Sequence, residues 1–323
     1  MIMTALPAAA TSQSFSKESK AMFGQLLKGA ACVIAFAAPA AAAETQLTTL
    51  AGTVSVQPNP TEVITFDLGT LDTLTALEVD VAGVPSPIYV PALEHLDDGT
   101  RPHIGTLFEP DYEQVFALKP DLILAGPRTR EQIEFLGKIA PTVDMSPFSD
   151  DIEKVVKTQT TELGALFGKE AKATDLVDQL HRSLETLRAL TKDAGKGLIV
   201  MTNGPKLSAF GPGSRFGWVH ETFGVEPLLD NVDAETHGEA ISFEFLHEVN
   251  PDWLIVFDRT KATRGDGATA DVTLNNELVA QTTAMQKGQV IYVHPADFYI
   301  ATTGVRSLQD TVDQFIAAFG AAQ

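Results

Sequence analysis

Cysteine is almost absent from this sequence of 323 residues, which holds a single one, Cys32. That residue lies in an apolar stretch near the N-terminus, so the rest of the chain can form no disulfide and perform no thiol chemistry. Basic residues are also few, since 23 Lys and Arg stand against 42 Asp and Glu and give a formal net charge of −19. This excess of negative charge argues against nucleic acid or an anionic membrane surface as a partner.

Motifs of common enzyme classes are missing as well. Gly211-Pro-Gly213 lacks the third glycine and the strand-to-helix context of a nucleotide-binding fingerprint, and indicates only a turn. The sequence shows no nucleophile elbow, no metal-binding helix motif and no paired catalytic carboxylates. Its histidines lack the spacing of a clustered metal site. These absences weigh against an enzyme and against the capture of a free zinc or manganese ion.

The chain does contain ample material for folded cores. Hydrophobic residues make up 44% of it and charged residues 20%, which is the composition of a globular protein. A length of 323 residues is long for one domain and comfortable for two. We therefore expect two domains, each with its own core.

The N-terminus has the pattern of an export signal. Lys17, Lys20 and Lys28 precede an apolar run over 29–43 that is too short to span a bilayer and ends in small residues. We predict a signal peptide over 1–43, with Met22 as an alternative start. Gly29-Ala-Ala-Cys32 loosely resembles a lipoprotein signal, but Lys28 lies where that signal needs its apolar run. The mature protein is expected to be soluble and periplasmic.

A unit of the sequence occurs twice, 131 residues apart, over 113–128 and 244–259. Each copy has the pattern of a helix end, a Pro-Asp turn, an apolar strand and then an arginine. The shared positions are Glu113, Pro120-Asp121 and Arg128 in the first copy and Glu244, Pro251-Asp252 and Arg259 in the second. Because ligands bind beyond the carboxyl ends of strands in open α/β sheets, each copy directs an arginine toward a shared cleft.

The pattern between these units predicts an α/β fold with two Rossmann-like lobes joined by one long helix. After an extended lead-in over 44–60, short apolar runs alternate with helical stretches, as in a largely parallel sheet. Leucines recur at helical spacing from about Lys169 to Asp193, which makes roughly 38 Å of helix. We predict an N-terminal lobe over 44–167, an interlobe helix over 168–195 and a C-terminal lobe over 196–323.

Several segments give the whole mature chain a resemblance to a known family. They are Leu118-Lys-Pro120-Asp-Leu-Ile123, Ile139-Ala-Pro-Thr142, Phe210-Gly-Pro-Gly-Ser-Arg215-Phe-Gly217, His237-Gly238, Asn250-Pro-Asp-Trp-Leu-Ile-Val-Phe-Asp-Arg259 and Ile291-Tyr-Val-His-Pro-Ala-Asp-Phe-Tyr299. With these segments in this order, the chain resembles the periplasmic iron–siderophore-binding proteins of ABC importers, which are class III (cluster A) substrate-binding proteins. Within them it is most similar to the group that binds ferric catecholate-type siderophores.

This resemblance implies a binding site with three arginines, at Arg128, Arg215 and Arg259. A ferric catecholate complex is an anion, and guanidinium groups donate hydrogen bonds to its oxygens with a rigid geometry. The pairing of Arg128 with Arg259 in the repeat supports their role independently. Arg215, in a glycine-rich loop, joins them on the resemblance alone.

The resemblance also implies two protein ligands to iron, His237 and Tyr299. Fe(III) is a hard cation that prefers oxygen donors, so a phenolate suits it and an imidazole is acceptable. Such ligands are needed only where the siderophore donates four oxygens and leaves two coordination sites open. The chain departs from the family at Asp297-Phe298-Tyr299, where relatives often carry an aromatic or aliphatic residue, then tryptophan, then tyrosine. An acid at Asp297 beside an anionic ligand is unfavourable unless it points away or pairs with an arginine.

The two leading glutamates of the repeat, Glu113 and Glu244, match the residues by which this family docks on its permease. The expected function is that of a monomeric carrier with no intrinsic cofactor, which binds Fe(III) as a siderophore complex and delivers it to an inner-membrane ABC permease. The alternatives are a carrier of haem, a corrinoid or another iron chelate, and an α/β enzyme.

Overall fold

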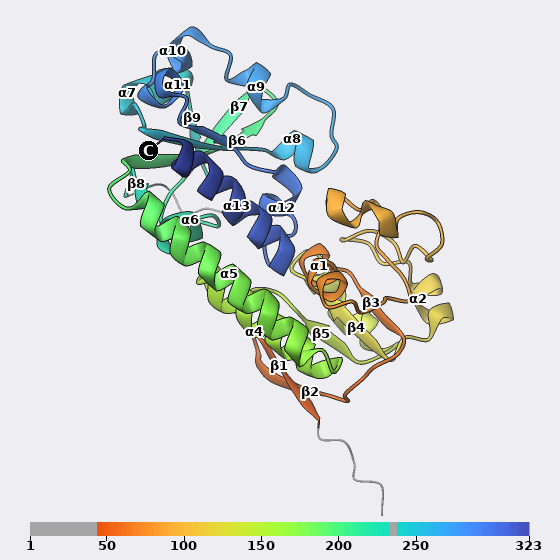
Figure 1. Ribbon diagram of the computed structural model, residues 1–323. Coiled ribbons are helices and arrows are strands. Elements are labelled where there is room, and N and C mark those ends of the chain that lie inside the picture. The colour runs from red at the N-terminus through yellow and green to blue at the C-terminus, as the bar shows by residue number, and fades with distance from the viewer. Residues whose placement is uncertain (1–43, 231, 233–237, 323) are drawn as a thin grey trace, which may run out of the picture. The chain divides into compact units, whose positions relative to one another are not determined.

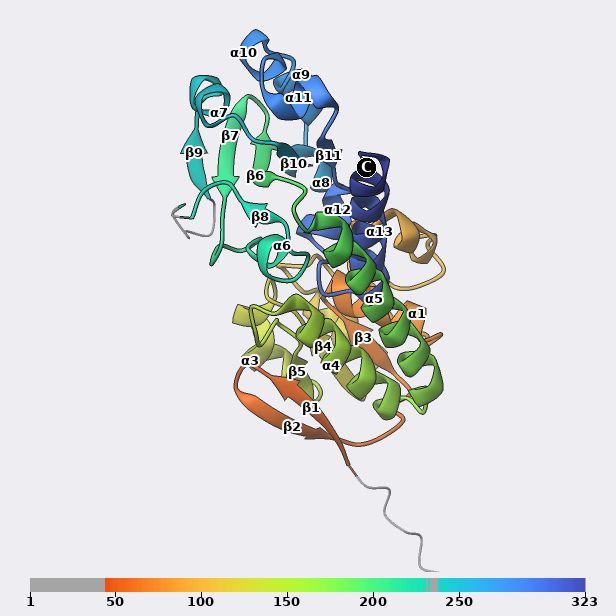
Figure 2. The same cartoon turned by 60° about the vertical axis from the view of Figure 1, so that its left-hand side comes forward.

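The first sheet is short, parallel and built from the N-terminal half of the chain. Figures 1 and 2 show a computed structural model that describes residues 44–230, 232 and 238–322, so the predicted signal peptide over 1–43 lies outside the described residues. Strands β3 (Val63–Thr65), β4 (Leu122–Ala125) and β5 (Thr142–Asp144) lie side by side in that order. Helices α1 (Leu68–Ala76), α2 (Tyr112–Leu118) and α3 (Ile133–Leu136), with 3-10 turns η1 (Pro91–Leu96) and η2 (Arg130–Gln132), connect the strands. The βα alternation predicted here is confirmed.

Residues 44–60 form a hairpin rather than a simple extended lead-in. Strands β1 (Thr45–Thr49) and β2 (Gly52–Val56) pair antiparallel, and β1 packs on helix α4 (Ile152–Leu166). The backbone N–H and the hydroxyl of Thr48 donate to the two carboxylate oxygens of Glu162, at 2.7 and 2.6 Å. The sequence prediction missed α4, whose buried residues Val155, Val156 and Leu163 recur at helical spacing.

The long helix predicted from the leucine spacing is α5, Glu170–Thr191. Its buried stripe includes Val177, Leu180, Leu184 and Leu187, which pack against α4 and against the last helix, α13 (Val305–Ala321). Both views show α5 and α13 side by side (Figures 1 and 2). Residues 42–323 form one compact unit, and their division into lobes at the predicted boundaries stays a prediction.

The second sheet is mixed, whereas the strand pattern alone favoured a parallel one. Its order is β11-β10-β6-β7-β9, and β8 also pairs with β6. Strand β7 runs antiparallel to both of its neighbours because a tight turn at Gly204, with a positive φ of 56°, connects it to β6. The strands are β6 (Lys196–Asn203), β7 (Lys206–Phe210), β8 (Glu226–Pro227), β9 (Glu239–Ile241), β10 (Trp253–Asp258) and β11 (Val290–Tyr292).

Short helices follow the strands of this second sheet. The first of them, α6 (Trp218–Glu221), follows the glycine-rich loop after β7. The others are α7 (Phe243–Val249), α8 (Arg259–Ala262), α9 (Ala270–Thr273), α10 (Glu277–Ala280), α11 (Thr283–Lys287) and α12 (Pro295–Tyr299). None of the helices within the described residues is both long and apolar enough to cross a membrane.

The repeated unit has the same local structure in both copies, as the sequence predicted. Helices α2 and α7 each end at a left-handed residue, Lys119 with φ 50° or Asn250 with φ 45°, before the Pro-Asp pair. Asp121 accepts hydrogen bonds from the N–H groups of residues 61 and 62, at the start of β3, and Asp252 accepts one from Lys196 N, at the start of β6. The aspartate of each Pro-Asp pair thus joins two neighbouring parallel strands.

An aromatic core holds the end of the chain against the second sheet. The rings of Phe216 and Phe298 stack with centroids 5.1 Å apart, and Phe257 lies 4.5 Å from Phe216. Trp218 packs 5.0 Å from Phe298. Because Phe298 belongs to α12 and is fully buried, this packing fixes the position of its neighbour, Tyr299.

Helix α1 caps the N-terminus of α13. The buried carboxylate of Asp72 accepts hydrogen bonds from Arg306 N at 2.8 Å and Ser307 N at 3.2 Å, and Thr73 Oγ1 accepts one from Val305 N. A side chain at Gly304 would place its Cβ 2.4 Å from Asp72 Oδ2, so glycine is required for this close approach. The contact ties the helix that follows β3 to the C-terminal helix.

Candidate ligand-binding cleft

A cavity of about 620 Å³ lies where the strand ends of the two sheets meet. Its lining comes from segments that follow parallel strands: Asp67 after β3, Arg128 after β4, residues 147–152 after β5, Arg259 after β10 and residues 299–303 beyond β11. The glycine-rich loop around Arg215 completes it. The cavity therefore occupies the place that the repeated unit predicted for a ligand.

Tyr299 is the residue on which the three predicted arginines converge. Its carbonyl oxygen accepts hydrogen bonds from Arg128 Nη2 at 3.0 Å and from Arg215 Nη2 at 2.8 Å. Its hydroxyl oxygen lies 3.4 Å from Arg259 Nε, which donates to it. Arg128 also donates from Nη1 to the carbonyl of Ile300 at 3.3 Å. Residues 171 positions apart in the chain thus form one cluster.

The ring of Tyr299 supports two of these guanidinium groups. Arg215 Cζ lies 4.4 Å from the ring centroid, and Arg128 Cζ lies 5.6 Å from it. A cation over an aromatic face is attracted by the ring's quadrupole, by about 0.5–1 kcal/mol at exposed sites and more where water is excluded. This attraction offsets part of the repulsion between neighbouring positive charges.

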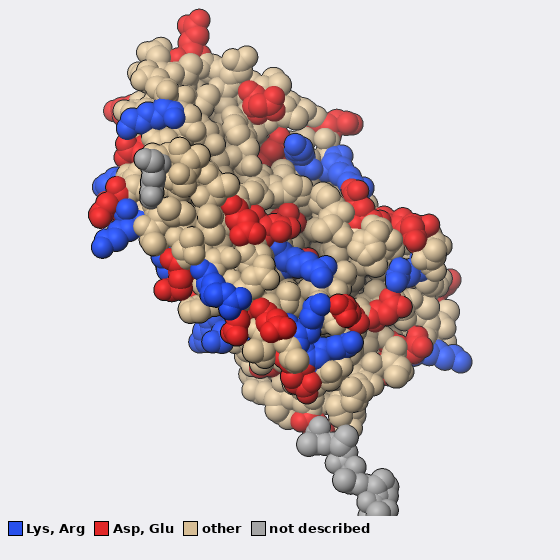
Figure 3. Space-filling view, viewed as in Figure 1, with Lys and Arg blue, Asp and Glu red and all other residues tan. Residues whose placement is uncertain are grey.

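Arg128, Arg215 and Arg259 form no ion pair with any carboxylate among the residues that the structure describes. Burial and then the charge of Arg215 lower the pKa of Arg128, and the charge of Asp67 opposes them only in part. The cluster is a local excess of positive charge in a chain with net charge −19. On the face drawn in Figure 3, acidic and basic side chains are interspersed, so the net charge does not describe each part of the surface.

Asp67 is the buried acid of the cavity lining, and it serves mainly as a helix cap. Its Oδ2 accepts hydrogen bonds from Thr70 N at 2.8 Å and from Thr70 Oγ1 at 2.9 Å, at the start of α1. Burial raises the pKa of Asp67, although the bonds from Thr70 and the charge of Arg128 oppose that rise. The sequence prediction missed this residue, whose signal was its place just after a buried strand.

The surroundings of Tyr299 stabilise its phenolate form more than water stabilises that of an ordinary tyrosine. Burial raises the pKa of a phenol, but the hydrogen bond from Arg259 and the charges of Arg215 and Arg259 outweigh it, and the pKa of Tyr299 lies below its ordinary value. A phenolate is a strong donor to a hard cation such as Fe(III). The site therefore combines hydrogen-bond donors for an anion with a potential metal ligand.

Comparison with known proteins places the chain in a family. Residues 63–296 match the family described as "Periplasmic binding protein". The chain belongs to the periplasmic binding protein family. It is 35% identical over 262 residues to the petrobactin-binding protein YclQ of Bacillus subtilis, covering 80% of this chain and 82% of YclQ. It is 32% identical over 274 residues to the ferric-anguibactin-binding protein FatB of Vibrio anguillarum, covering 83% and 85%.

Solved structures of this periplasmic binding protein family share the fold. The crystal structure of YclQ matches with a TM-score of 0.79 at 32% identity, over 85% of this chain and 98% of that one. The catecholate-siderophore binding protein VctP of Vibrio cholerae matches with a TM-score of 0.79 at 28% identity, over 86% and 99%. These matches confirm the predicted class III fold, and the family confirms a binding protein rather than an enzyme.

Asp297, the departure noted in the sequence, does not face the cavity. It is buried on α12, where Oδ2 lies 2.8 Å from His294 Nδ1 and Oδ1 accepts a hydrogen bond from Ser307 Oγ at 3.3 Å. The hydrogen bond with Asp297 is the main cause that raises the pKa of His294. Asp297 therefore points away from the arginine cluster and leaves its positive charge undiminished.

The remaining predicted residues lie elsewhere or outside the described part. Glu113 and Glu244 are exposed and occupy the same position, the second residue of α2 and of α7. A bond with its own N–H and one with the Ser242 hydroxyl lower the pKa of Glu244. His237 lies outside the described residues. Within the described residues no group of three or more His, Cys, Asp and Glu could hold a metal ion.

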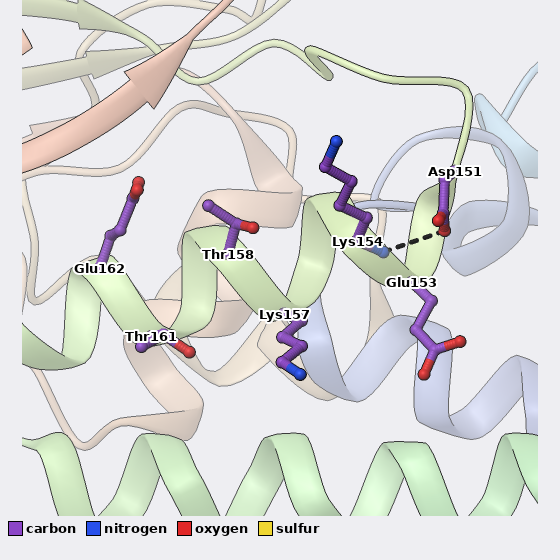
Figure 4. Close-up of a pocket in the computed structure, with 7 residues that line it drawn as sticks. All are labelled: Asp151, Glu153, Lys154, Lys157, Thr158, Thr161 and Glu162. Atoms are coloured by element: carbon purple, nitrogen blue, oxygen red, sulfur yellow. Dashed lines mark hydrogen bonds between the residues drawn. The ribbon is translucent and has the colours of Figure 1, made fainter. Parts of the chain in front are cut away.

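Another hollow, of about 550 Å³, lies along α4, but its residues do not converge. Figure 4 shows its side chains, all from α4 and its N-cap, pointing to opposite sides of that helix. Asp151 accepts a hydrogen bond from Lys154 N at 3.0 Å as the helix cap, and Glu153 binds His181 and Arg188. Its acidic residues already have partners within the fold, Glu162 through its bonds from Thr48, which distinguishes this hollow from the arginine-lined cleft.

Proposed function

We propose that this periplasmic binding protein captures an anionic ferric siderophore of the catecholate type in the arginine-lined cavity and delivers it to an ABC importer of the inner membrane. The observation that carries the proposal is the convergence of Arg128, Arg215 and Arg259 on Tyr299 without a carboxylate partner in the described structure. Fe(III) is the cargo and arrives as the siderophore complex.

An anionic ligand completes this site electrostatically. Three guanidinium groups close together repel one another, and an anion between them turns that repulsion into attraction. Charge-assisted hydrogen bonds to oxygen are about twice as strong as neutral ones, and the planar guanidinium presents its donors in pairs. A cavity of about 620 Å³ is within the range that holds compact organic ligands.

Three of the more similar relatives are named for a siderophore cargo. YclQ binds petrobactin, FatB binds ferric anguibactin and VctP binds a catecholate siderophore. Haem and corrinoids have no comparable need for three arginines, so this cluster favours the siderophore over those alternatives. We extend the siderophore class to this chain and leave the individual siderophore to measurement.

Protein atoms complete the coordination of iron when the siderophore supplies four oxygens. We propose Tyr299 as the phenolate donor, prepared for this role by its lowered pKa, and His237 as a second donor. A hexadentate siderophore would leave no position for either residue, so the arginines alone would then hold the complex.

We further propose that Glu113 and Glu244 dock the loaded protein on the permease. Both are exposed at the same position of equivalent helices, as expected for contacts with a transporter of twofold pseudo-symmetry. A monomer exported by the signal peptide over 1–43 suits this role. The periplasm is the expected location of the mature chain.

The test is a titration of residues 44–323 with a tetradentate ferric bis-catecholate, followed by tryptophan fluorescence and by the visible spectrum. We expect tight binding and a shift of the visible band that Tyr299→Phe abolishes. Tight binding without any effect of Tyr299→Phe or His237→Ala would retain the carrier and reject direct iron ligation. Parallel titrations with ferric citrate, haem and a corrinoid serve as comparisons, and tight binding of one of these alone would reject the proposal.

A further inference from the structure

Phe108 is an exposed aromatic residue in the lining of the cavity. Its exposed fraction is 59%, whereas the other two apolar aromatic residues of the lining, Phe216 and Trp218, are 1% and 6% exposed. The rings of Phe216 and Trp218 are already covered by the aromatic core. Phe108 therefore lines the cavity and keeps more than half of its surface uncovered by the described residues.

The turn that carries Phe108 is held in one conformation by local bonds. Thr106 Oγ1 accepts hydrogen bonds from Phe108 N at 3.2 Å and from Glu109 N at 2.9 Å, and Thr106 N donates to Glu109 O at 2.9 Å. Gly105 has a φ of 104°, and a Cβ there would lie 2.3 Å from Glu109 O. The backbone thus leaves little freedom at the point where the ring projects.

The same turn is anchored next to the arginine cluster. Its buried residue Leu107 accepts a hydrogen bond at 2.6 Å from the hydroxyl of Thr129, which is itself fully buried. Thr129 directly follows Arg128, so the segment that carries this arginine also holds the turn with the ring. An apolar ring is therefore held at a set position beside the charged cluster.

The exposed ring and the arginines together indicate which kind of ligand the cavity can recognise. The exposed part of a phenylalanine ring forgoes the favourable free energy of burial, which a bound ligand can recover. The arginines need an anion, and the ring needs an apolar, preferably aromatic, surface at the same time. Carboxylate or hydroxycarboxylate chelates satisfy the first requirement only, while chelates built on aryl groups satisfy both.

We propose that the ring of Phe108 packs on an aryl group of the bound ferric siderophore and so makes the site selective for aryl chelates over hydroxycarboxylate chelates. The inference rests on the proposed function and assigns Phe108 as a specificity-determining residue of that site. Phe116 and Phe135 are also exposed, at 69% and 52%, but neither lines the cavity. They supply matched controls.

The experiment compares wild-type residues 44–323 with Phe108→Ala, Phe108→Leu and the control Phe116→Ala. The probes are a tetradentate ferric bis-catecholate and ferric citrate, and thermal unfolding confirms that each variant is folded. For the catecholate we expect Phe108→Ala to weaken binding about tenfold, Phe108→Leu about threefold, and Phe116→Ala not at all. We expect any binding of ferric citrate to change less than twofold in all three variants.

Other outcomes would overturn the inference separately from the proposed function. If the wild type binds the catecholate and Phe108→Ala binds it equally well, Phe108 has no part in recognition. If Phe108→Leu matches the wild type, the contact is apolar but not specific for an aryl ring, which rejects the selectivity. If Phe108→Ala weakens ferric citrate as much as the catecholate, its effect is structural. A wild type that binds no ferric catecholate would reject the proposed function together with this inference.

Discussion

Arg259 donates a hydrogen bond from Nε to the phenolic oxygen of Tyr299, and the two atoms lie 3.4 Å apart. Arg259 is the first residue after β10, the strand of the second repeat, and Tyr299 is the last residue of α12. The bond stabilises the phenolate more than the phenol, because a guanidinium is both a donor and a positive charge. It thereby joins the anion-binding group of the cleft to its proposed iron ligand.

This relationship predicts the order in which the tyrosines ionise. Burial raises the pKa of Tyr112 and of Tyr292, with a further contribution from Asp271 at Tyr292, while the pKa of Tyr299 is lowered. In a spectrophotometric pH titration of the ligand-free protein, the tyrosine ionisation at lowest pH should be absent in Tyr299→Phe. The same ionisation should shift to higher pH in Arg259→Gln, which removes the positive charge beside the phenolate. An unchanged first step in Tyr299→Phe would refute the assignment.

Loss of a cleft arginine should weaken ligand binding. We expect Arg215→Ala and Arg259→Ala each to reduce the affinity for a ferric bis-catecholate by roughly 1–3 kcal/mol, as for the loss of a hydrogen bond to a charged group. Arg130→Ala is the matched control, because Arg130 is exposed, pairs with Asp144 at 3.2 Å and does not line the cavity. Equal affinities in all three variants, measured by fluorescence titration, would remove the anion argument.

Asp72 should make stability depend on pH. Its burial raises its pKa from an ordinary value of 3.8 to about 7, and its Oδ1 has no hydrogen-bond partner among the described residues. Between about pH 4 and 7 the folded protein keeps a proton that the unfolded chain releases, so the free energy of unfolding falls as the pH rises, by roughly 1.4 kcal/mol per unit.

Asp72→Asn should remove this contribution while its amide oxygen still accepts the bonds from Arg306 N and Ser307 N. Urea unfolding at pH 5, 6, 7 and 8 measures it for both proteins. We expect the stability of the variant relative to the wild type to rise between pH 5 and 7 and then to level off. Parallel curves for the two proteins would show that Asp72 titrates normally.

Glu113 and Glu244 should matter for delivery and not for capture. We expect Glu113→Gln with Glu244→Gln to leave siderophore affinity unchanged and to lower iron uptake in cells at least several-fold, because the contacts with the permease would be lost. Glu248→Gln is the control, since Glu248 is exposed on the same helix, α7, as Glu244. Uptake equal to that of the control would place the docking contacts elsewhere.

The repeated unit was the most reliable guide that the sequence offered. Helix end, left-handed residue, Pro-Asp pair and buried strand all follow from local preferences, and both copies have this structure. Periodicity likewise located α5, because its leucines recur at helical spacing. The same reasoning missed strand β7, since so short a segment takes its final form from the elements that it packs against. It also missed α4, although the buried residues of that helix recur at helical spacing.

The sequence by itself determined the α/β elements, the Pro-Asp turns and the places of Arg128 and Arg259 just beyond strand ends. Only the tertiary structure decided that these residues and Arg215 converge on Tyr299, that Asp297 turns toward Ser307, and that Phe108 remains exposed in the cavity. The physical reason is the separation along the chain over which each interaction acts. Backbone preferences act between neighbours in the chain, whereas the distance from Arg128 to Tyr299, 171 residues later, is set by the packing of the aromatic core and of α1 on α13.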